Sequence, residues 1–195
     1  MTSDHLPEPE PRYTPGAQRV LDAASDLFYR EGIHAVGVDS IAQAAGVTKK
    51  TLYDRFGSKE ALVVAYLRGR DSRWREYLES ELEALPAGPG RVGALFDISR
   101  AWADLHGARG CSAINARAEV ESPADPIAHE AIRQKKWLRD IFERECRSAG
   151  LADPGPLADA LMLLYEGALV TTGMGTFADP FGVARESAQR LISRG

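Results

Sequence analysis

The sequence predicts an all-α protein, and three observations support that class. In each periodic segment beyond Thr14, apolar residues recur at the three- and four-residue spacing of an amphipathic helix. No segment shows the sustained apolar–polar alternation of a half-buried strand. The Asn-Gly and Asp-Gly pairs typical of hairpin turns are also absent from the sequence. With 44% hydrophobic and 27% charged residues, the chain can form a packed core.

The first element is expected at Thr14. Residues 1–13 hold three prolines and three acids, so we expect a disordered tail. Thr14 can cap a helix that has Pro15 at its first position, and Gly32 ends it. Two short helices are then expected over residues 39–45 and 49–56.

A long helix is expected from just after Ser58 to about Leu85, where a Pro/Gly cluster at 86–90 ends it. We interpret this cluster as a linker, because the long helix itself ties the two halves of the chain together. The remaining helices are expected over residues 91–106, 126–149, 156–174 and 181–193.

Composition excludes several classes of protein. A net charge of −4 excludes a uniformly basic surface for nucleic acid or anionic lipid. Two cysteines cannot build a disulfide framework, and no Cys/His cluster has zinc-site spacing, so we expect neither a metal nor a cofactor. We find no signal-peptide core and no apolar run near the ~20 residues of a membrane helix. A soluble cytoplasmic protein with no membrane partner is expected.

Charge is divided unevenly along the chain. Residues 46–75 contain eight Lys/Arg and three Asp/Glu, a net charge of +5. Residues 76–195 contain 13 basic and 18 acidic residues, a net charge of −5. A local basic patch on an acidic protein is typical of a small DNA-reading module.

The segment 38–60 carries the functional signal. Asp39 is expected to cap the first short helix, whose Ile41, Ala44 and Ala45 would face inward. Gly46 permits the left-handed turn between two helices, and Thr48 can cap the second helix. These features predict a helix-turn-helix.

The second of these helices has two different sides. Leu52 and Phe56 would point to the core, whereas Lys49, Lys50 and Tyr53 would face solvent. Exposed lysines beside the positive end of a helix dipole are unfavourable by roughly 0.3–1 kcal/mol each. Contact with DNA phosphates would explain why they stand there.

This segment resembles the TetR (tetracycline-repressor-like) family of transcriptional regulators. The resemblance covers about residues 15–67 and rests on Ala-Ala-Ser-Asp-Leu-Phe from 23, on Gly32, and on the run Gly-Val-Thr-Lys-Lys-Thr-Leu-Tyr-Asp-Arg-Phe-Gly-Ser-Lys-Glu-Ala-Leu from 46. It implies an all-α homodimer with an N-terminal three-helix DNA-binding domain, joined by a long helix to a larger C-terminal domain for ligand and dimer contacts. The expected parts are a tail (1–13), a DNA-binding domain (14–67, motif about 38–57) and an effector-binding and dimerisation domain (68–195).

The resemblance also implies the contacts with a double-stranded DNA operator. Lys49 and Lys50 would lie at the floor or edge of the major groove, and Tyr53 would meet a phosphate or a thymine methyl. The other four would contact the DNA backbone. The expected DNA-binding residues are Thr48, Lys49, Lys50, Thr51, Tyr53, Arg55 and Lys59.

The C-terminal half is expected to bind a small, largely apolar effector among the helices of residues 91–174. Aromatic side chains would supply flat apolar surface, and His and Asn could orient a polar group. The same side chains could equally be ordinary core residues. The candidates are Trp102, His106, Cys111, Asn115, Trp137 and Tyr165.

A homodimer built from the last two helices is expected, because residues 156–174 are apolar on nearly every side and need partners on most of them. The alternative is a helix that is wholly internal to a monomer. The expected interface residues are Leu157, Leu161, Leu164, Ala168, Phe181, Ala184, Ala188 and Leu191.

Two further classes of function stay open. Arg109 lies close to Cys111 in sequence, and nearby positive charge favours a reactive thiolate, so a sensor of oxidants or electrophiles is one alternative. A small helical enzyme or a metal site using His106, Cys111 and Glu119 is the other. Its spacing matches no nucleophile or metal motif, so the chain is expected not to be an enzyme.

Overall fold

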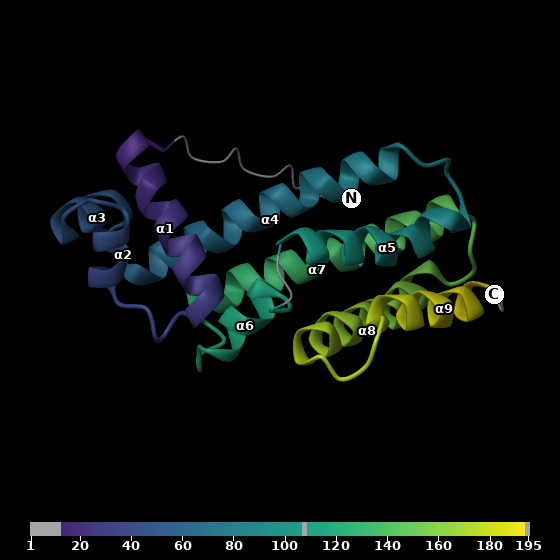
Figure 1. The fold of residues 1–195 in the computed structure, drawn as a ribbon. Helices are drawn as coiled ribbons and strands as arrows, with labels where there is room; N and C mark the ends of the chain where they lie inside the picture. Colours follow the sequence, from purple (N-terminus) through teal and green to yellow (C-terminus); the bar gives the residue numbers. More distant parts are fainter. Residues whose placement is uncertain (1–12, 107–108, 194–195) are drawn as a thin grey trace. The chain divides into compact units, whose positions relative to one another are not determined.

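The computed structural model describes residues 13–106 and 109–193, and within these ranges it contains nine helices and no strand. The all-α prediction is therefore confirmed (Figure 1). The helices are α1 (Pro15–Glu31), α2 (Val38–Ala44), α3 (Lys49–Phe56), α4 (Lys59–Glu83), α5 (Pro89–His106), α6 (Ser112–Ala118), α7 (Pro126–Ser148), α8 (Pro154–Met174) and α9 (Pro180–Ile192).

The chain divides into two compact units, residues 1–69 (unit 1) and 70–195 (unit 2), and α4 runs from one into the other. Unit 1 contains α1, α2, α3 and the first part of α4. Its core forms because each of these helices buries one apolar stripe. The stripes meet through Val20, Ala24, Phe28, Ile41, Leu52, Leu62, Val63 and Tyr66, all buried.

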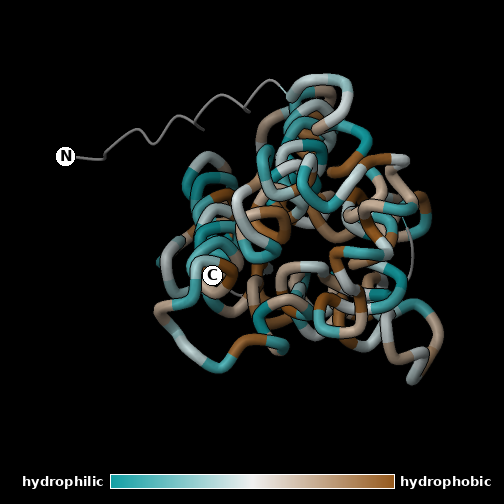
Figure 2. The backbone as a smooth tube through the Cα atoms, turned by 90° about the vertical axis from the view of Figure 1, so that its left-hand side faces the viewer, coloured by the Kyte–Doolittle hydropathy of each residue, from teal (hydrophilic) through white to brown (hydrophobic). Residues whose placement is uncertain are grey.

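Unit 2 has a larger core, centred on the rings of Phe96 and Phe142, whose centroids lie 5.7 Å apart. The end of α4 contributes Leu78 and Leu82 to this core. Helix α8 packs against both α7 and α9, and Figure 1 shows α8 and α9 side by side. Figure 2 shows hydrophobic and hydrophilic residues alternating along the helices, as expected when each helix buries one side.

Several helix ends follow from the capping residues. The Thr14 hydroxyl accepts a hydrogen bond from the Ala17 amide, and the Asp125 carboxylate accepts one from the Ile127 amide. Helices α5 and α8 each begin two residues before the expected start, at Pro89 and Pro154. Proline is tolerated in a first helical turn, so it belongs to these helices and does not merely precede them.

Helix α6, Ser112–Ala118, was not expected. It is a short helix of mostly small residues, and only Ala113 and Ala116 are buried. Two alanines three residues apart give almost no periodic signal. This helix packs against α7. That contact forms only in the folded protein, and it stabilises a helix that its own residues would not.

Details of unit 1 correct two expectations and leave a third untested. Gly37, not Asp39, is the N-cap of α2, so Asp39 lies within the first turn. Ala42 is buried where Ala44 was expected, and Ala44 is exposed. The predicted tail, residues 1–13, lies outside the described residues except for Tyr13, whose ring lies 5.7 Å from that of Phe56.

Burial of residues on α8 and α9 corrects part of the expected dimer interface. Five of the eight residues predicted for this interface are buried in the core of unit 2. Their side chains are therefore not available to a partner subunit. The sequence could not separate the inward stripe of α8 from its outward stripe, because both are apolar. Leu157 and Leu164 are half-buried and Leu191 is exposed; the buried five are Leu161, Ala168, Phe181, Ala184 and Ala188.

Helix α8 is also the one helix in the described ranges that is long and apolar enough to cross a membrane, so the expectation that no such run exists was wrong. A buried core helix of a water-soluble protein meets the same criterion. Here Leu161 and Tyr165 are buried, and Glu166 forms an ion pair with Lys135 of α7.

Candidate nucleic-acid interface and effector pocket

Helices α2 and α3 are joined by a tight turn at Gly46, which has a φ of 63°. This left-handed conformation is strained for residues with a Cβ, so glycine suits the position. The turn is closed by hydrogen bonds from the Gly46 amide to the Gln43 carbonyl and from the Val47 amide to the Ala42 carbonyl. The turn fixes the direction of α3 relative to α2, as a helix-turn-helix requires.

Helix α3 has one buried side and one exposed side. The Thr48 hydroxyl accepts a hydrogen bond from the Thr51 amide (3.1 Å) and so caps the helix. Leu52 is fully buried, whereas the Tyr53 ring is 44% exposed. Lys49 and Lys50 are exposed beside it. The polar side of α3 therefore presents two ammonium groups and a phenol to solvent.

Both lysines have acidic partners that sequence reasoning missed. The Lys49 ammonium lies 2.7 Å from the Asp39 carboxylate of α2, and the Lys50 ammonium lies 2.7 Å from Asp54, one turn further along α3. The expected repulsion between these lysines and the helix dipole is therefore compensated locally. The i, i+4 spacing of Lys50 and Asp54 was a signal that could have revealed one of the pairs.

The charge of unit 1 is smaller than the +5 of residues 46–75 suggests. Arg70, Arg73 and Arg75 belong to unit 2, and Arg75 is bound to Asp71 there. Residues 1–69 contain eight Lys/Arg and nine Asp/Glu, a net charge of −1. Any attraction of unit 1 for phosphate must therefore come from the local arrangement around α3, and not from the unit as a whole.

The other predicted DNA-binding residues surround α3. The Thr51 hydroxyl lies 3.0 Å from that of Thr48, and Arg55 is exposed in the last turn of α3. Lys59 is the first residue of α4, whose start is capped by the Ser58 hydroxyl accepting from the Ala61 amide. All seven predicted residues lie within α3, its cap and the first turn of α4.

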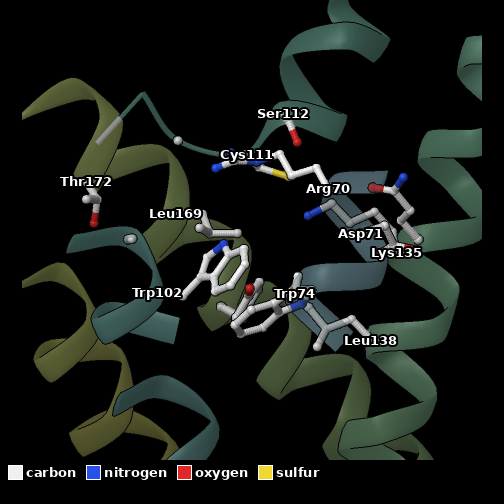
Figure 3. Close-up of a pocket in the computed structure, with 14 residues that line it drawn as sticks. Arg70, Asp71, Trp74, Trp102, Cys111, Ser112, Lys135, Leu138, Leu169 and Thr172 are labelled. Atoms are coloured by element: carbon white, nitrogen blue, oxygen red, sulfur yellow. The ribbon is translucent and has the colours of Figure 1, made fainter. Parts of the chain in front are cut away.

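Unit 2 contains a pocket with a cavity volume of about 80 Å³ between α4, α5, α7, α8 and the segment before α6. Three of the six predicted effector-binding residues line it: Trp102, Cys111 and Tyr165. In Figure 3 the indole rings of Trp74 and Trp102 lie on one side, and Arg70, Cys111 and Ser112 on the other. The pocket therefore combines an aromatic wall with a polar one.

The other three candidates do not line the pocket. His106 stacks on Trp102, with ring centroids 3.7 Å apart, and burial together with Arg70 and Arg73 lowers the pKa of its imidazole. The Asn115 amide donates to the Arg109 carbonyl. The Trp137 ring lies 4.2 Å from the guanidinium of Arg75. These side chains are occupied by contacts within unit 2.

Sequence reasoning missed the charged lining of the pocket. The Lys135 ammonium pairs with Glu166 at 2.7 Å and lies 5.9 Å from the centre of the Tyr165 ring. Burial acts to lower the pKa of Lys135, but the attraction of Cys111 and Glu166 outweighs it and raises the pKa overall. In sequence, Lys135 is one of several charges on an amphipathic helix, so no local signal distinguishes it.

A buried ion network supports one side of the pocket. The Asp71 carboxylate lines the cavity and lies 2.8 Å from the guanidinium groups of both Arg75 and Arg133. Arg133 also binds Glu130, one turn before it on α7, at 2.6 Å. Burial raises the pKa of Asp71, and the two arginines oppose this shift. The network joins α4 to α7 next to the pocket.

A contact between two glycines forms another wall. A Cβ at position 173 would lie 3.2 Å from the backbone nitrogen of Gly110 and 3.3 Å from its Cα. Gly110 itself has a φ of 74° and immediately precedes Cys111. Glycine suits both positions: the φ of Gly110 is left-handed, and a Cβ at position 173 would require the main chain before α6 to shift by a few tenths of an ångström.

The comparisons with known proteins agree with this architecture. Residues 20–66 match the family model described as "Bacterial regulatory proteins, tetR family". The chain is 46% identical over 57 residues to an uncharacterised HTH-type transcriptional regulator, Rv1255c of Mycobacterium tuberculosis. That match spans 29% of this chain and 28% of the relative, so the chain covers less than a third of that relative's length.

The crystal structure of SCO4454, a TetR-family transcriptional regulator from Streptomyces coelicolor, extends the similarity to the whole chain. It is 32% identical, with a TM-score of 0.83, and the match covers 91% of this chain and 96% of that one. The chain belongs to the TetR family. This TetR-family chain is also 27% identical to the HTH-type transcriptional repressor DhaR of Mycobacterium sp. over 80% of its own length and 82% of the relative.

Proposed function

We propose that this protein is a DNA-binding transcriptional regulator that acts in the cytoplasm, binds a palindromic operator as a homodimer and responds to a small effector. The observation that carries the proposal is the exposed side of α3. This side presents Lys49, Lys50 and Tyr53, and the Thr48 hydroxyl caps the start of the helix. Family membership supports a regulator and not an enzyme. Repression is supported by the similarity to DhaR, which is named a repressor.

DNA binding would exchange the acidic partners of the two lysines for phosphates or base edges. The Lys50–Asp54 and Lys49–Asp39 pairs are exposed, and exposed pairs contribute only about 0–1 kcal/mol each. The exchange therefore costs little.

Homodimer formation is supported by the outward stripe of α8. Leu163 is 76% exposed and Met174 69% exposed, and with Gly167 and Val170 they recur at helical spacing on one side. Apart from its chain neighbours and the backbone of α8 itself, no described atom lies within 4 Å of a Cβ placed on Gly167, so a partner helix could approach closely there. A contiguous exposed apolar surface of this kind is typical of an interface. Val183 and Leu191 are the exposed apolar residues of α9.

Effector response is supported by the position of the pocket on α4. Arg70, Asp71 and Trp74 line the pocket, and they belong to the same helix that starts in unit 1 at Lys59. A ligand that prefers one placement of this helix would change operator affinity. A tenfold change requires about 1.4 kcal/mol of coupling.

The DNA-binding proposal is tested by selecting bound sequences from a random duplex library and measuring affinity for the recovered operator. The double substitution Lys49→Ala and Tyr53→Ala should weaken specific binding. The expected loss is roughly 1–3 kcal/mol for each base-edge hydrogen bond or methyl contact that the two side chains make. Lys136→Ala on α7 is a matched control, exposed but distant in sequence from α3. Unchanged operator binding by the folded double variant would contradict the proposal.

The dimer proposal is tested by Leu163→Glu, with Leu105→Glu as control. Both leucines are exposed, but Leu105 lies on α5 and outside the α8 stripe. Analytical ultracentrifugation at micromolar concentration should give a dimer for the wild type and the control and a monomer for Leu163→Glu. A monomeric wild type would exclude this part of the proposal.

A second candidate is a thiol-responsive regulator, favoured by the placement of the half-buried Cys111 thiol in the pocket lining. Cys146 is an internal control, because burial and the nearby Glu145 raise its pKa to about 11. Mass spectrometry after brief iodoacetamide treatment should find Cys111 alkylated and Cys146 intact. Operator binding that is unchanged after alkylation would exclude this candidate.

A further inference from the structure

The Lys49–Asp39 ion pair joins the two helices of the helix-turn-helix. Lys49 is the first residue of α3, Asp39 lies in the first turn of α2, and the two helices contact each other (Figure 1). The ammonium nitrogen and a carboxylate oxygen lie 2.7 Å apart, yet the two side chains are 52% and 76% exposed. A hydrogen-bond donor and a hydrogen-bond acceptor therefore lie next to each other on the surface, where both can meet a further partner.

The place of this pair at the start of α3 favours contact with bases. In a helix-turn-helix the N-terminal residues of the second helix reach base edges in the major groove, and the first helix crosses the DNA backbone. Lys49 is at that N-terminal end, and the ion pair holds the Asp39 carboxylate beside its ammonium group. The carboxylate would therefore enter the groove together with the ammonium group.

Attraction to phosphate does not account for the pair. Lys49 and Asp39 together carry no net charge, the same holds for Lys50 and Asp54, and unit 1 as a whole has a net charge of −1. A neutral pair attracts phosphate weakly, and a carboxylate without its cation would be repelled. What the pair offers is a pattern, one donor beside one acceptor. Sequence is read through such patterns at base edges, whereas phosphates carry no sequence information.

A G·C base pair presents the complementary pattern in the major groove. Guanine O6 accepts a hydrogen bond there, and the cytosine N4 amino group donates one. Because these two atoms are hydrogen-bonded to each other within the base pair, they lie about 2.9 Å apart. This separation is close to the 2.7 Å between the ammonium nitrogen of Lys49 and the carboxylate oxygen of Asp39. Each member of the ion pair can therefore face its own partner on a single base pair.

A second acceptor distinguishes G·C from A·T. An ammonium group has three N–H donors, so Lys49 can keep Asp39 and still donate to both guanine O6 and guanine N7. In an A·T pair the acceptor beside the adenine amino group is thymine O4, and the next group along that edge is the thymine C5-methyl. An ammonium group there finds one acceptor instead of two and lies against a methyl group. The ion pair therefore fits G·C better than A·T.

We propose that the Lys49–Asp39 pair reads one G·C base pair in each half of the operator. The Lys49 ammonium group donates to guanine O6 and N7, and the Asp39 carboxylate accepts from the cytosine N4 amino group. In the reversed C·G pair the carboxylate would face a carbonyl oxygen and the ammonium an amino group, so the ion pair also reads orientation. Of the two lysine pairs, only Lys50–Asp54 then exchanges its partner on binding. This base-reading role rests on the proposed DNA binding and specifies one base pair of the operator.

The test measures how strongly the full-length protein discriminates between duplexes. The operator recovered from the random library is compared with duplexes in which each G·C pair of one half-site is changed in turn to A·T and to C·G. Fluorescence anisotropy gives the affinities. At one position either change should weaken wild-type binding roughly 5- to 150-fold, which corresponds to about 1–3 kcal/mol. We call this factor the discrimination ratio of that position.

Variants assign the discrimination ratio to the ion pair. Asp39→Ala removes the acceptor for cytosine and should lower the ratio at this position by at least about fivefold, the low end for one such contact, without changing the ratios elsewhere. Lys49→Ala removes the donor for guanine and should lower the same ratio. Because the ratio compares two duplexes bound by the same protein, a partly unfolded variant does not alter it.

Asp54→Asn is the matched control. It also removes an exposed carboxylate 2.7 Å from a lysine ammonium group, but this pair lies within α3. Operator affinity should rise for all duplexes alike, and every discrimination ratio should stay as in the wild type. Asp39→Ala would behave in the same way if Asp39 were only a counter-ion of Lys49, and that result would overturn the base-reading role.

Two further outcomes separate this role from the proposed function. An operator that is selected and bound, but in which no G·C pair has a ratio that depends on Asp39, supports the proposed DNA binding and excludes the base-reading role. Failure to select any duplex contradicts both. A ratio that falls equally in Asp39→Ala and in Asp54→Asn also overturns the role, because it would reflect the loss of any negative charge near α3.

Discussion

The two units use charged side chains in opposite ways. On α3 the Lys49–Asp39 and Lys50–Asp54 pairs are exposed to water, so each pair contributes little to folding and either partner can be exchanged. Around Asp71 in unit 2 the carboxylate side chain is only 4% exposed, and removing one partner would leave charges buried without compensation. Charge on α3 is therefore available for recognition, whereas charge at Asp71 is fixed by the fold.

The largest expected effect comes from Asp71→Asn. Arg75 and Arg133 would lose a carboxylate at 2.8 Å while keeping their own charges. We expect a loss of roughly 3 kcal/mol in the free energy of unfolding, the low end for a broken buried pair because Arg133 is partly exposed. Urea denaturation measures it. If the free energy of unfolding fell by less than about 0.5 kcal/mol, the range of an ordinary surface substitution, the charges around Asp71 would matter to folding no more than those on α3.

The second prediction concerns a residue that is expected to affect DNA recognition but not the stability of the fold. Lys49→Ala should weaken operator binding by about 1–3 kcal/mol if its ammonium makes a base contact, and should change the free energy of unfolding by less than about 0.5 kcal/mol. Fluorescence anisotropy with labelled operator and urea denaturation give the two values. A variant that loses stability and binding equally would indicate that Lys49 is structural.

The third effect separates capping from charge on α3. Thr48→Ala removes the hydroxyl that accepts from the Thr51 amide, so we expect a loss of about 1 kcal/mol in stability. Thr48→Ser keeps the acceptor and should be close to the wild type. Hydrogen exchange of α3 amides reports the effect locally; exchange rates identical in all three proteins would contradict it.

The smallest effect is expected from Asp54→Asn, which removes the partner of Lys50. Stability should change by no more than about 0.5 kcal/mol, the usual range for an i, i+4 pair. Operator affinity should rise, because one negative charge beside the phosphates is removed. Lower affinity in this variant would mean that Asp54 positions Lys50 for binding.

Unit 1 was largely predictable because its signals are local. The Thr48 cap, the turn at Gly46 and the alternation of Leu52 with exposed residues each lie within a few residues of one another. The pairing of Lys49 with Asp39 was not predicted, since it joins two helices and depends on the angle of the turn.

Unit 2 was predictable as a set of helices but not as a site. Trp102 and Trp137 have the same helical spacing signal, yet Trp102 lines the pocket and Trp137 covers Arg75. Which side of a helix meets which neighbour is decided by packing between distant segments. The inward stripe of α8 was mistaken for a dimer interface for the same reason, because Leu161 and Leu163 are equally apolar.

The contact between Gly110 and Gly173 limits how this pocket can diversify. It joins two main chains, so no change of side-chain rotamer can accommodate a methyl group at position 173. Gly173→Ala would require the main chain at Arg109 and Gly110 to shift by a few tenths of an ångström. Because Gly110 and Cys111 line the pocket, a substitution at position 173, which does not line it, would change the shape of the pocket through the main chain.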